Sequence, residues 1–358
     1  MLYVLAFLVV LSVVVLIHEA GHFFMARLCG VRVEEFSFGF GRELFGVTSK
    51  KSGTRYKVCV LPLGGYVKML GNDDVASVRG KEVAEELRKY AFQHQAPWKK
   101  FLIVLAGPFM NYLFAIVALA MLFMFAGAYS VPPVIESVVE GSPAQMAGVQ
   151  PKDIVRKVNG RGITDFAQLR KAIMLTHNAA VVLHVERSGQ FLDIEVVPQL
   201  NDDKMPFIGV GGGSLATIQS ERLAPWPAVR LALYEAYNMT HATLVYIRQI
   251  LFSGRSASQM RGPLGIAEMS GDAASGGALS LLVFIVQVSI AIGLINLMPI
   301  PLMDGSHLIL YVLEMIRGKP VSEKTLTIMA YLGWGIILFL LLYTFYNDIP
   351  RIWGRLWS

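Results

Sequence analysis

Charged residues are scarce in this 358-residue chain, because Asp, Glu, Lys and Arg together make up only 16% of it. Soluble globular proteins carry about 25%, so the deficit excludes a disordered chain, a nucleic-acid-binding tail and a purely soluble protein. Two cysteines exclude a disulfide-stabilised scaffold. Hydrophobic residues are abundant instead, at 54%, with a mean hydropathy of +0.52. The net charge of +6 fits nucleic acid or an anionic membrane surface; this composition favours the membrane, with no nucleic-acid partner.

The hydrophobic residues are concentrated in four long stretches that carry almost no charge. These stretches are 1–26, 101–127, 279–303 and 325–347. A helix needs about 20 residues to cross a hydrocarbon core of about 30 Å, and a helix satisfies its own backbone hydrogen bonds within lipid. We therefore predict four transmembrane α-helices. We expect the first to be a retained helix rather than a signal peptide, because it lacks a basic start and a cleavage pattern.

The distribution of Lys and Arg predicts the orientation in the membrane. The segment 27–100 contains 14 basic residues, whereas the roughly twice longer segment 128–278 contains 13. An excess of basic residues marks cytoplasmic loops, so we expect 27–100 and 304–324 in the cytoplasm. Both termini and 128–278 then lie outside it. Cys29 and Cys59 fall on the reducing side, which suits free thiols.

The cytoplasmic segment 27–100 contains two patterns typical of strands. One is 33–41, with alternating aromatic residues and glycines, and the other is 56–63, followed by the glycine-containing run 64–69. Beside a membrane-embedded site, such strands could offer an edge to an extended peptide. They could equally form a small structural sheet, and the sequence leaves both possibilities open. The charged segment 75–89 is predicted to be solvated.

Between the second and third spans the sequence predicts one compact α+β domain, 128–200. Its strands and helices are expected at 134–139, 144–147, 153–158, 166–174, 181–187 and 192–198. This order, with Ser-Pro-Ala, Ala-Gly and Asn-Gly at the turns, resembles a PDZ domain in the circularly permuted bacterial form. Lys152 stands where such domains usually have glycine, and no second copy of the pattern is visible.

The region 201–278 is predicted to be a linker followed by an amphipathic helix. The run 209–213 is glycine-rich, and apolar residues recur at helical spacing over 229–251. This helix carries too many charges to span a membrane. It would lie on the outer membrane face or pack on the domain.

The strongest chemical signal is His18-Glu19-Ala20-Gly21-His22 in the first span. Residues i and i+4 share a helical face, so two imidazoles can bind one zinc ion and Glu19 can act as general base on zinc-bound water. The alternative is that these groups merely hydrogen-bond between helices. Ionisable groups in an apolar span are costly and usually functional, which favours the metal.

A catalytic zinc site needs a third protein ligand and keeps one open position. Asp304 is the natural candidate, because Pro299 and Pro301 interrupt the third span just before it. The predicted topology brings Asp304 to the membrane depth of His22. His307 is a rival ligand that lies further from the span.

Two asparagines lie within the predicted spans. Asn296 could stabilise the oxyanion of a tetrahedral intermediate, or it could join helices by hydrogen bonding; the sequence does not choose between them. Asn111 is interpreted as structural.

Together these motifs resemble the site-2 protease family. They are the His-Glu-x-x-His run of the first span, Ala106-Gly107-Pro108 with Asn111 in the second, and Asn296 to Gly305 in the third. The segments 36–41, 64–70 and 262–266 resemble its bacterial RseP (regulator of sigma-E protease) branch. Met303 replaces the family's usual Leu before Asp304, an exchange that conserves volume. RseP proteins often carry two PDZ domains, and one is visible here.

The resemblance implies a zinc-dependent intramembrane endopeptidase that cuts peptide bonds in or near the transmembrane segments of single-pass membrane proteins. Family substrates include anti-sigma factors and remnant signal peptides, cut by regulated intramembrane proteolysis. It implies Zn²⁺ bound by His18, His22 and Asp304, the bacterial inner membrane as location, and a substrate or a regulator on the PDZ-like domain. The alternatives are a non-catalytic PDZ membrane adaptor, in which Glu19 has no task, and a membrane metalloprotease that cuts soluble peptides.

We therefore predict a multi-pass α-helical membrane protein with four transmembrane helices, an inserted α+β PDZ-like domain and a small cytoplasmic β element. The predicted segments are helix 1 with the zinc motif (1–26), cytoplasmic loop (27–100), helix 2 (101–127), extracytoplasmic PDZ-like domain (128–200), linker and amphipathic helix (201–278), helix 3 (279–303), cytoplasmic segment with the third ligand (304–324), helix 4 (325–347) and extracytoplasmic tail (348–358).

Overall fold

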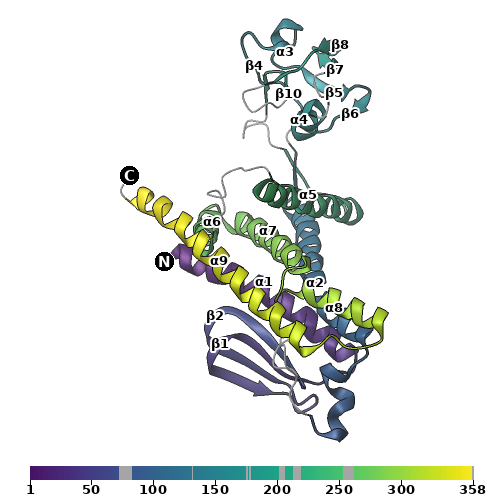
Figure 1. The fold of residues 1–358 in the computed structure, drawn as a ribbon. Helices are drawn as coiled ribbons and strands as arrows, with labels where there is room; N and C mark the ends of the chain where they lie inside the picture. Colours follow the sequence, from purple (N-terminus) through teal and green to yellow (C-terminus); the bar gives the residue numbers. More distant parts are fainter. Residues whose placement is uncertain are drawn as a thin grey trace. The chain divides into compact units, whose positions relative to one another are not determined.

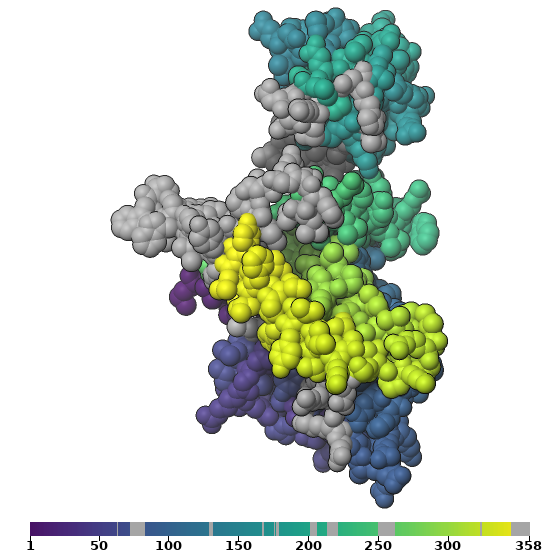
Figure 2. Space-filling model, in the orientation of Figure 1, coloured from purple at the N-terminus to yellow at the C-terminus, as the bar shows by residue number. Residues whose placement is uncertain are grey.

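The computed structural model describes residues 1–71, 83–130, 132–174, 176, 179–200, 206–212, 219–252 and 262–356. The chain divides into two compact units. The first, here called the helical unit, comprises Met1–Ala120 and Val229–Ser358. The second, here called the inserted unit, comprises Met121–Ala228. Figures 1 and 2 show both, coloured along the sequence.

Four helices of the described residues are long and apolar enough to cross a membrane. They are α1 (Leu2–Leu28), α2 (Pro97–Phe125), α7 (Ala278–Leu297) and the part Lys324–Thr344 of α9 (Glu323–Leu356). They cover most of each of the four predicted stretches, and the largest difference is at the third. The third helix ends at Leu297 and not at 303, because Met298 precedes Pro299 and is forced into an extended conformation. The chain then turns into α8 (Asp304–Arg317).

Two long, bent strands, β1 (Val33–Thr48) and β2 (Arg55–Met69), form the sheet of the predicted cytoplasmic loop (Figure 1). Residues 35–38 of β1 are paired on both sides, with 65–68 of β2 on one side and 55–58 on the other. Within the described part of the chain, residues 65–69 pair with β1 alone, which makes this part of β2 an edge of the sheet. The predicted solvated segment 75–89 lies partly outside the described residues, and its end forms the 3₁₀-helix η1 (Glu85–Tyr90). A second 3₁₀ turn, η2 (Phe92–His94), leads into α2.

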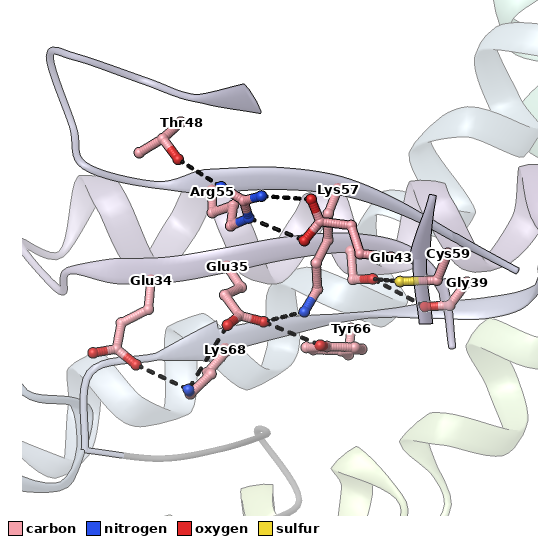
Figure 3. A network of polar contacts seen from close by, with 11 residues as sticks. Glu34, Glu35, Gly39, Glu43, Thr48, Arg55, Lys57, Cys59, Tyr66 and Lys68 are labelled. Carbon is pink, nitrogen blue, oxygen red and sulfur yellow. Dashed lines mark hydrogen bonds and ion pairs between the residues drawn. The ribbon is translucent and has the colours of Figure 1, made fainter. Parts of the chain in front are cut away.

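Polar side chains join the strands of this sheet, as Figure 3 shows. Glu35 accepts hydrogen bonds from Lys57 and from the Tyr66 hydroxyl, the latter at 3.1 Å. Lys68 Nζ lies 3.4 Å from Oε2 of Glu34. The hydrogen bond from Lys57 is the main cause that holds the pKa of Glu35 below its ordinary value. The sheet is thus connected by charged groups as well as by its backbone ladder.

Two helices occupy the part of the helical unit that was predicted as linker and amphipathic helix. α5 (Pro225–Phe252) covers the predicted stripe, and α6 (Pro263–Ser275) was not expected. α6 packs on α1, where the Tyr3 hydroxyl donates to Oδ1 of Asp272 at 3.2 Å and Gly271 lies against the Tyr3 ring. Its small residues leave no hydrophobic periodicity from which the helix could be recognised.

The apolar stripe predicted on α5 is largely exposed. Leu233, Tyr237 and Leu244 are among the exposed large hydrophobic residues, whereas the small Ala232 and Ala236 are buried. An exposed apolar stripe on a charged helix is typical of helices that lie at a membrane surface.

The inserted unit is a small α+β domain. Its elements are β3 (Ala128–Ser130), β4 (Ser137–Val138), α3 (Pro143–Met146), β5 (Ile154–Val158), β6 (Arg161–Gly162), α4 (Phe166–Met174), β7 (Val181–Arg187), β8 (Gln190–Val196), β9 (Gln199–Leu200), β10 (Pro206–Phe207), β11 (Val210–Gly211) and β12 (Gln219–Glu221). The main sheet has the order β6-β5-β7-β8, and an apolar core that includes Leu169 and Leu183 joins it to α4. Lys152 has φ +75°, a left-handed conformation that favours glycine, as its position in the predicted pattern implied.

The predicted domain boundary at 200 was too early. β11 pairs with β4, and Ile208 is buried in the domain core, so 206–212 belongs to the inserted unit and not to a linker. Glycine is needed there for close packing: a Cβ on Gly212 would overlap the Phe166 ring. The predicted strand 134–139 is correspondingly reduced to β4 and an isolated bridge between Val134 and Ile154.

Candidate metal centre

The first two candidate ligands lie one turn apart on α1. The helix continues without interruption through the motif, so His18 and His22 share a face, as their i, i+4 spacing requires. Both imidazoles are buried, and their Nε2 atoms are 3.2 Å apart. This face of α1 is directed at α2, since Nδ1 of His22 lies 2.9 Å from the backbone oxygen of Ile103.

Asp304 lies beside the two histidines although it is far from them in the sequence. It is the first residue of α8, immediately after the proline-containing turn that ends α7. Its Oδ2 atom lies 3.0 Å from Nε2 of His18 and 3.6 Å from Nε2 of His22. The side chain is nearly buried, with 11% of its surface exposed. The structure therefore brings together the three residues that the sequence nominated.

These three groups suit a zinc ion. With metal–ligand bonds of about 2.0–2.1 Å in tetrahedral geometry, neighbouring ligand atoms are about 3.3 Å apart. The observed separations of 3.0, 3.2 and 3.6 Å bracket that value. Oδ2 of Asp304 is buried and accepts no hydrogen bond from the described residues, so a cation would supply the partner that it lacks. Two imidazoles and one carboxylate leave a position for water, as in catalytic zinc sites.

His307 lies away from this cluster. It sits one turn further along α8, where its ring centroid is 6.3 Å from that of Tyr311. Among the described residues, the group able to hold a metal consists of His18, His22 and Asp304.

One ion pair and one apolar cluster hold α8 against α1 and α2. Lys100 of α2 pairs with Glu314 of α8 at 3.3 Å, and both side chains are mostly buried. Leu308 of α8 packs in one cluster with Phe23 of α1 and Ile103 of α2. These contacts hold Asp304 against the two histidines.

Glycine allows α1 and α2 to approach closely enough to build the site. A Cβ on Gly107 of α2 would overlap ring atoms of both His18 and His22, and a Cβ on Gly21 of α1 would overlap the Ala106 carbonyl. Small residues permit such approach between membrane helices.

We expect Gly107→Ala to weaken zinc binding by about 10- to 100-fold, because the added methyl group displaces both imidazoles, and a disturbed shell around a metal site costs about that factor in affinity. Zinc affinity measured on purified protein tests this. Gly335→Ala is the matched control, since Gly335 also lies in a membrane helix but has open space at its Cβ position. Equal zinc affinity in the two variants would contradict the packing argument.

Glu19 and Asn296 are both at the site, though neither belongs to the ligand cluster. Glu19 is half-buried beside β2, with its Oε2 atom buried, and a Cβ on Gly65 would lie 3.7 Å from Cγ of Glu19. Asn296 is half-buried near the end of α7, with Nδ2 3.5 Å from Nε2 of His18. Asn296 therefore lies beside a candidate ligand, whereas Glu19 follows His18 on α1 and lies beside β2.

Asn111 is closer to the site than the sequence interpretation assumed. It is fully buried, and Nδ2 lies 3.3 Å from Nδ1 of His18. Its position four residues after Gly107 puts both residues on one face of α2, but the sequence does not show that this face meets α1.

Comparison with known proteins agrees with this geometry. The model of peptidase family M50 matches residues 6–340. A protein of Rickettsia conorii whose name assigns it to the zinc metalloproteases is 37% identical over 362 residues, covering 99% of this chain and 100% of the relative. A protein of Rhizobium meliloti with the same kind of name is 36% identical over 361 residues, covering 97% and 96%. Metalloprotease MmpA of Caulobacter vibrioides is 31% identical over 377 residues, covering 96% and 94%. This chain therefore belongs to peptidase family M50, the site-2 protease family, and is a zinc metalloendopeptidase with membrane-spanning helices.

Proposed function

We propose that this enzyme hydrolyses peptide bonds in or near the transmembrane segments of single-pass membrane proteins. The observation that carries the proposal is the position of the cluster. His18 and His22 lie inside an apolar helix long enough to span a membrane, and Asp304 meets them from the turn just after another such helix. A substrate bond that reaches these residues must itself enter the membrane or its edge.

His18, His22 and Asp304 would hold the ion in this proposal. When bound, the ion would supply Lewis acidity, which makes water at the site more acidic and polarises the substrate carbonyl. Glu19 would accept a proton from the attacking water and later donate it to the leaving amine. Asn296 donates a hydrogen bond to the oxygen that becomes negative, which its approach to His18 supports.

The edge of β2 supports a way of presenting the substrate. A helical substrate hides its carbonyl groups in hydrogen bonds, so it must become extended before it is cut. Residues 65–69 pair with β1 on one side only, and Gly65 lies beside Glu19. An extended segment could add to this edge by main-chain hydrogen bonds. Of the two roles left open for the sheet, we favour this one over a purely structural one.

Exposed apolar side chains on the same sheet support its contact with lipid or with an apolar substrate. Phe40, Phe45, Val58 and Leu61 are all exposed, although they lie in a sheet that is rich in charged groups elsewhere. Apolar patches of this kind mark interaction sites.

The inserted unit supports a role in substrate admission. A hollow of about 390 Å³ lies between α4 and the strands β10 and β11, lined by apolar residues such as Leu169, Ile173 and Phe207. We propose that this unit is a PDZ-like domain that binds a peptide of the substrate or of a regulator. We propose the bacterial inner membrane as the location of the enzyme. In the orientation that the basic residues predict, this domain would lie outside the cytoplasm. Substrates whose outer domain is already removed, such as anti-sigma factors and remnant signal peptides, would then be admitted.

The test uses the purified full-length enzyme with zinc in lipid nanodiscs. Its substrates are a single-pass protein with a short outer tail, the same protein with a folded outer domain, and a soluble peptide of the same sequence. We expect cleavage of the first within or beside its membrane segment, and little of the other two. Glu19→Gln, which lacks the proposed general base, measures the background cleavage.

The other outcomes assign the protein differently. Preferred cleavage of the soluble peptide would overturn the intramembrane substrate class. A zinc-loaded enzyme that cuts none of the three would favour the membrane adaptor.

A further inference from the structure

We propose that Asn111 is a positioning residue for His18: its side-chain oxygen accepts the Nδ1 hydrogen of that imidazole and so presents Nε2 to the metal. This inference rests on the proposed assignment of His18 as a ligand. The two residues come from neighbouring helices, and both are buried.

The packing of α2 against α1 places one residue of α2 beside Nδ1 of each histidine. His18 and His22 lie four residues apart on α1, and three residues of α2, each four apart, face them: Ile103, Gly107 and Asn111. The backbone oxygen of Ile103 lies 2.9 Å from Nδ1 of His22. The amide of Asn111 lies 3.3 Å from Nδ1 of His18. Gly107, between them, provides the space for both rings.

The protonation of a metal-binding imidazole determines whether the oxygen or the nitrogen of the Asn111 side chain must face it. An imidazole that binds metal through Nε2 carries its hydrogen on Nδ1, and that hydrogen needs an acceptor. Ile103 offers a carbonyl oxygen to His22. His18 has the side chain of Asn111 in the corresponding place, and the oxygen of that side chain must take the same role.

The buried amide has an unused oxygen. Nδ2 of Asn111 faces Nδ1 of His18, an arrangement that suits the other tautomer, with its hydrogen on Nε2. Oδ1 of Asn111 is buried and accepts no hydrogen bond from the described residues. The two ends of an amide have nearly the same shape, so a half-turn about χ2 brings Oδ1 to Nδ1. Asparagine can thus serve either tautomer of His18, whereas an apolar residue serves neither.

The experiment measures zinc affinity of the purified full-length protein by competition with a chelator. We expect Asn111→Leu, which keeps the size but removes the acceptor, to lower the affinity about 10- to 100-fold, as loss of an outer-shell partner does. Asn111→Asp keeps an acceptor and should bind zinc at least as tightly as the wild type. Tyr112→Phe is the matched control. Tyr112 is on α2 like Asn111, but its hydroxyl faces away from His18 and lies 3.3 Å from Oγ1 of Thr240 on α5.

The aspartate variant separates positioning from folding. A structural role would make both substitutions at Asn111 equally harmful, so an Asn111→Asp protein that binds zinc as weakly as Asn111→Leu would overturn the inference. So would an Asn111→Leu protein within about threefold of the wild type. Should zinc bind as expected while no membrane substrate is cut, the proposed function fails and the role of Asn111 stands.

Discussion

Asp304→Ala is expected to lower zinc affinity by more than about 100-fold and to abolish proteolysis. Loss of an outer-shell partner typically costs 10- to 100-fold, and Asp304 would contribute a carboxylate oxygen directly, since Oδ2 lies 3.0 and 3.6 Å from the two Nε2 atoms. Two imidazoles alone would leave the ion without its charge-neutralising ligand. Zinc content after dialysis and chelator competition measure the effect on the purified protein.

His307→Ala is the control for this experiment. His307 is also on α8 and is the other candidate that the sequence offers, but it packs beside Tyr311 and outside the cluster. It should keep zinc affinity within about threefold of the wild type. Full zinc retention in Asp304→Ala, with loss in His307→Ala, would transfer the third ligand to His307.

The three candidate ligands could be nominated from the sequence because their selection depends on local rules. The spacing of His18 and His22 fixes a shared helical face, and two prolines end the third span before Asp304. Both statements need only the chain and the thickness of a bilayer. The structure then places these three side chains together, from elements far apart in sequence.

The surroundings of the ligands could not be predicted in the same way. Whether Asn111 meets His18 depends on the register of α1 against α2, and that register is set by the close contact of Gly21 with Ala106. Such a contact leaves no periodic signal in either helix. α6 escaped prediction for a related reason, since it packs through glycine and serine instead of a hydrophobic stripe.

In the inserted unit, glycine content alone did not distinguish a flexible linker from a packed segment. The run 209–213 was interpreted as a linker because glycine is common in flexible segments. Gly209 and Gly212 have another task here, since a Cβ at either position would overlap Ser142 or Phe166. Glycine that permits close packing and glycine that permits flexibility look alike in sequence.

Glu19→Gln is expected to lower the cleavage rate by about 10²- to 10⁴-fold, the usual contribution of general acid–base catalysis, while zinc affinity stays within about threefold of the wild type. The substitution keeps the shape of the side chain and removes its ability to take a proton from water. Glu19 lies on α1 beside β2 and outside the ligand cluster, so the metal should remain. Initial rates on the single-pass substrate and zinc content on the same preparation measure both effects.

The combination of the two measurements distinguishes the roles that a carboxylate can have at this position. If Glu19 were a ligand, its substitution would reduce zinc binding and activity together. If it were a structural residue, its substitution would chiefly reduce the stability of the fold. Undiminished cleavage in Glu19→Gln would exclude it as the base. Glu19→Asp adds a test of distance, because it retains the proton-accepting group but withdraws it by one methylene. We expect Glu19→Asp to bind zinc normally and to cleave faster than Glu19→Gln but slower than the wild type, since a base must lie within hydrogen-bond reach of the water that it activates.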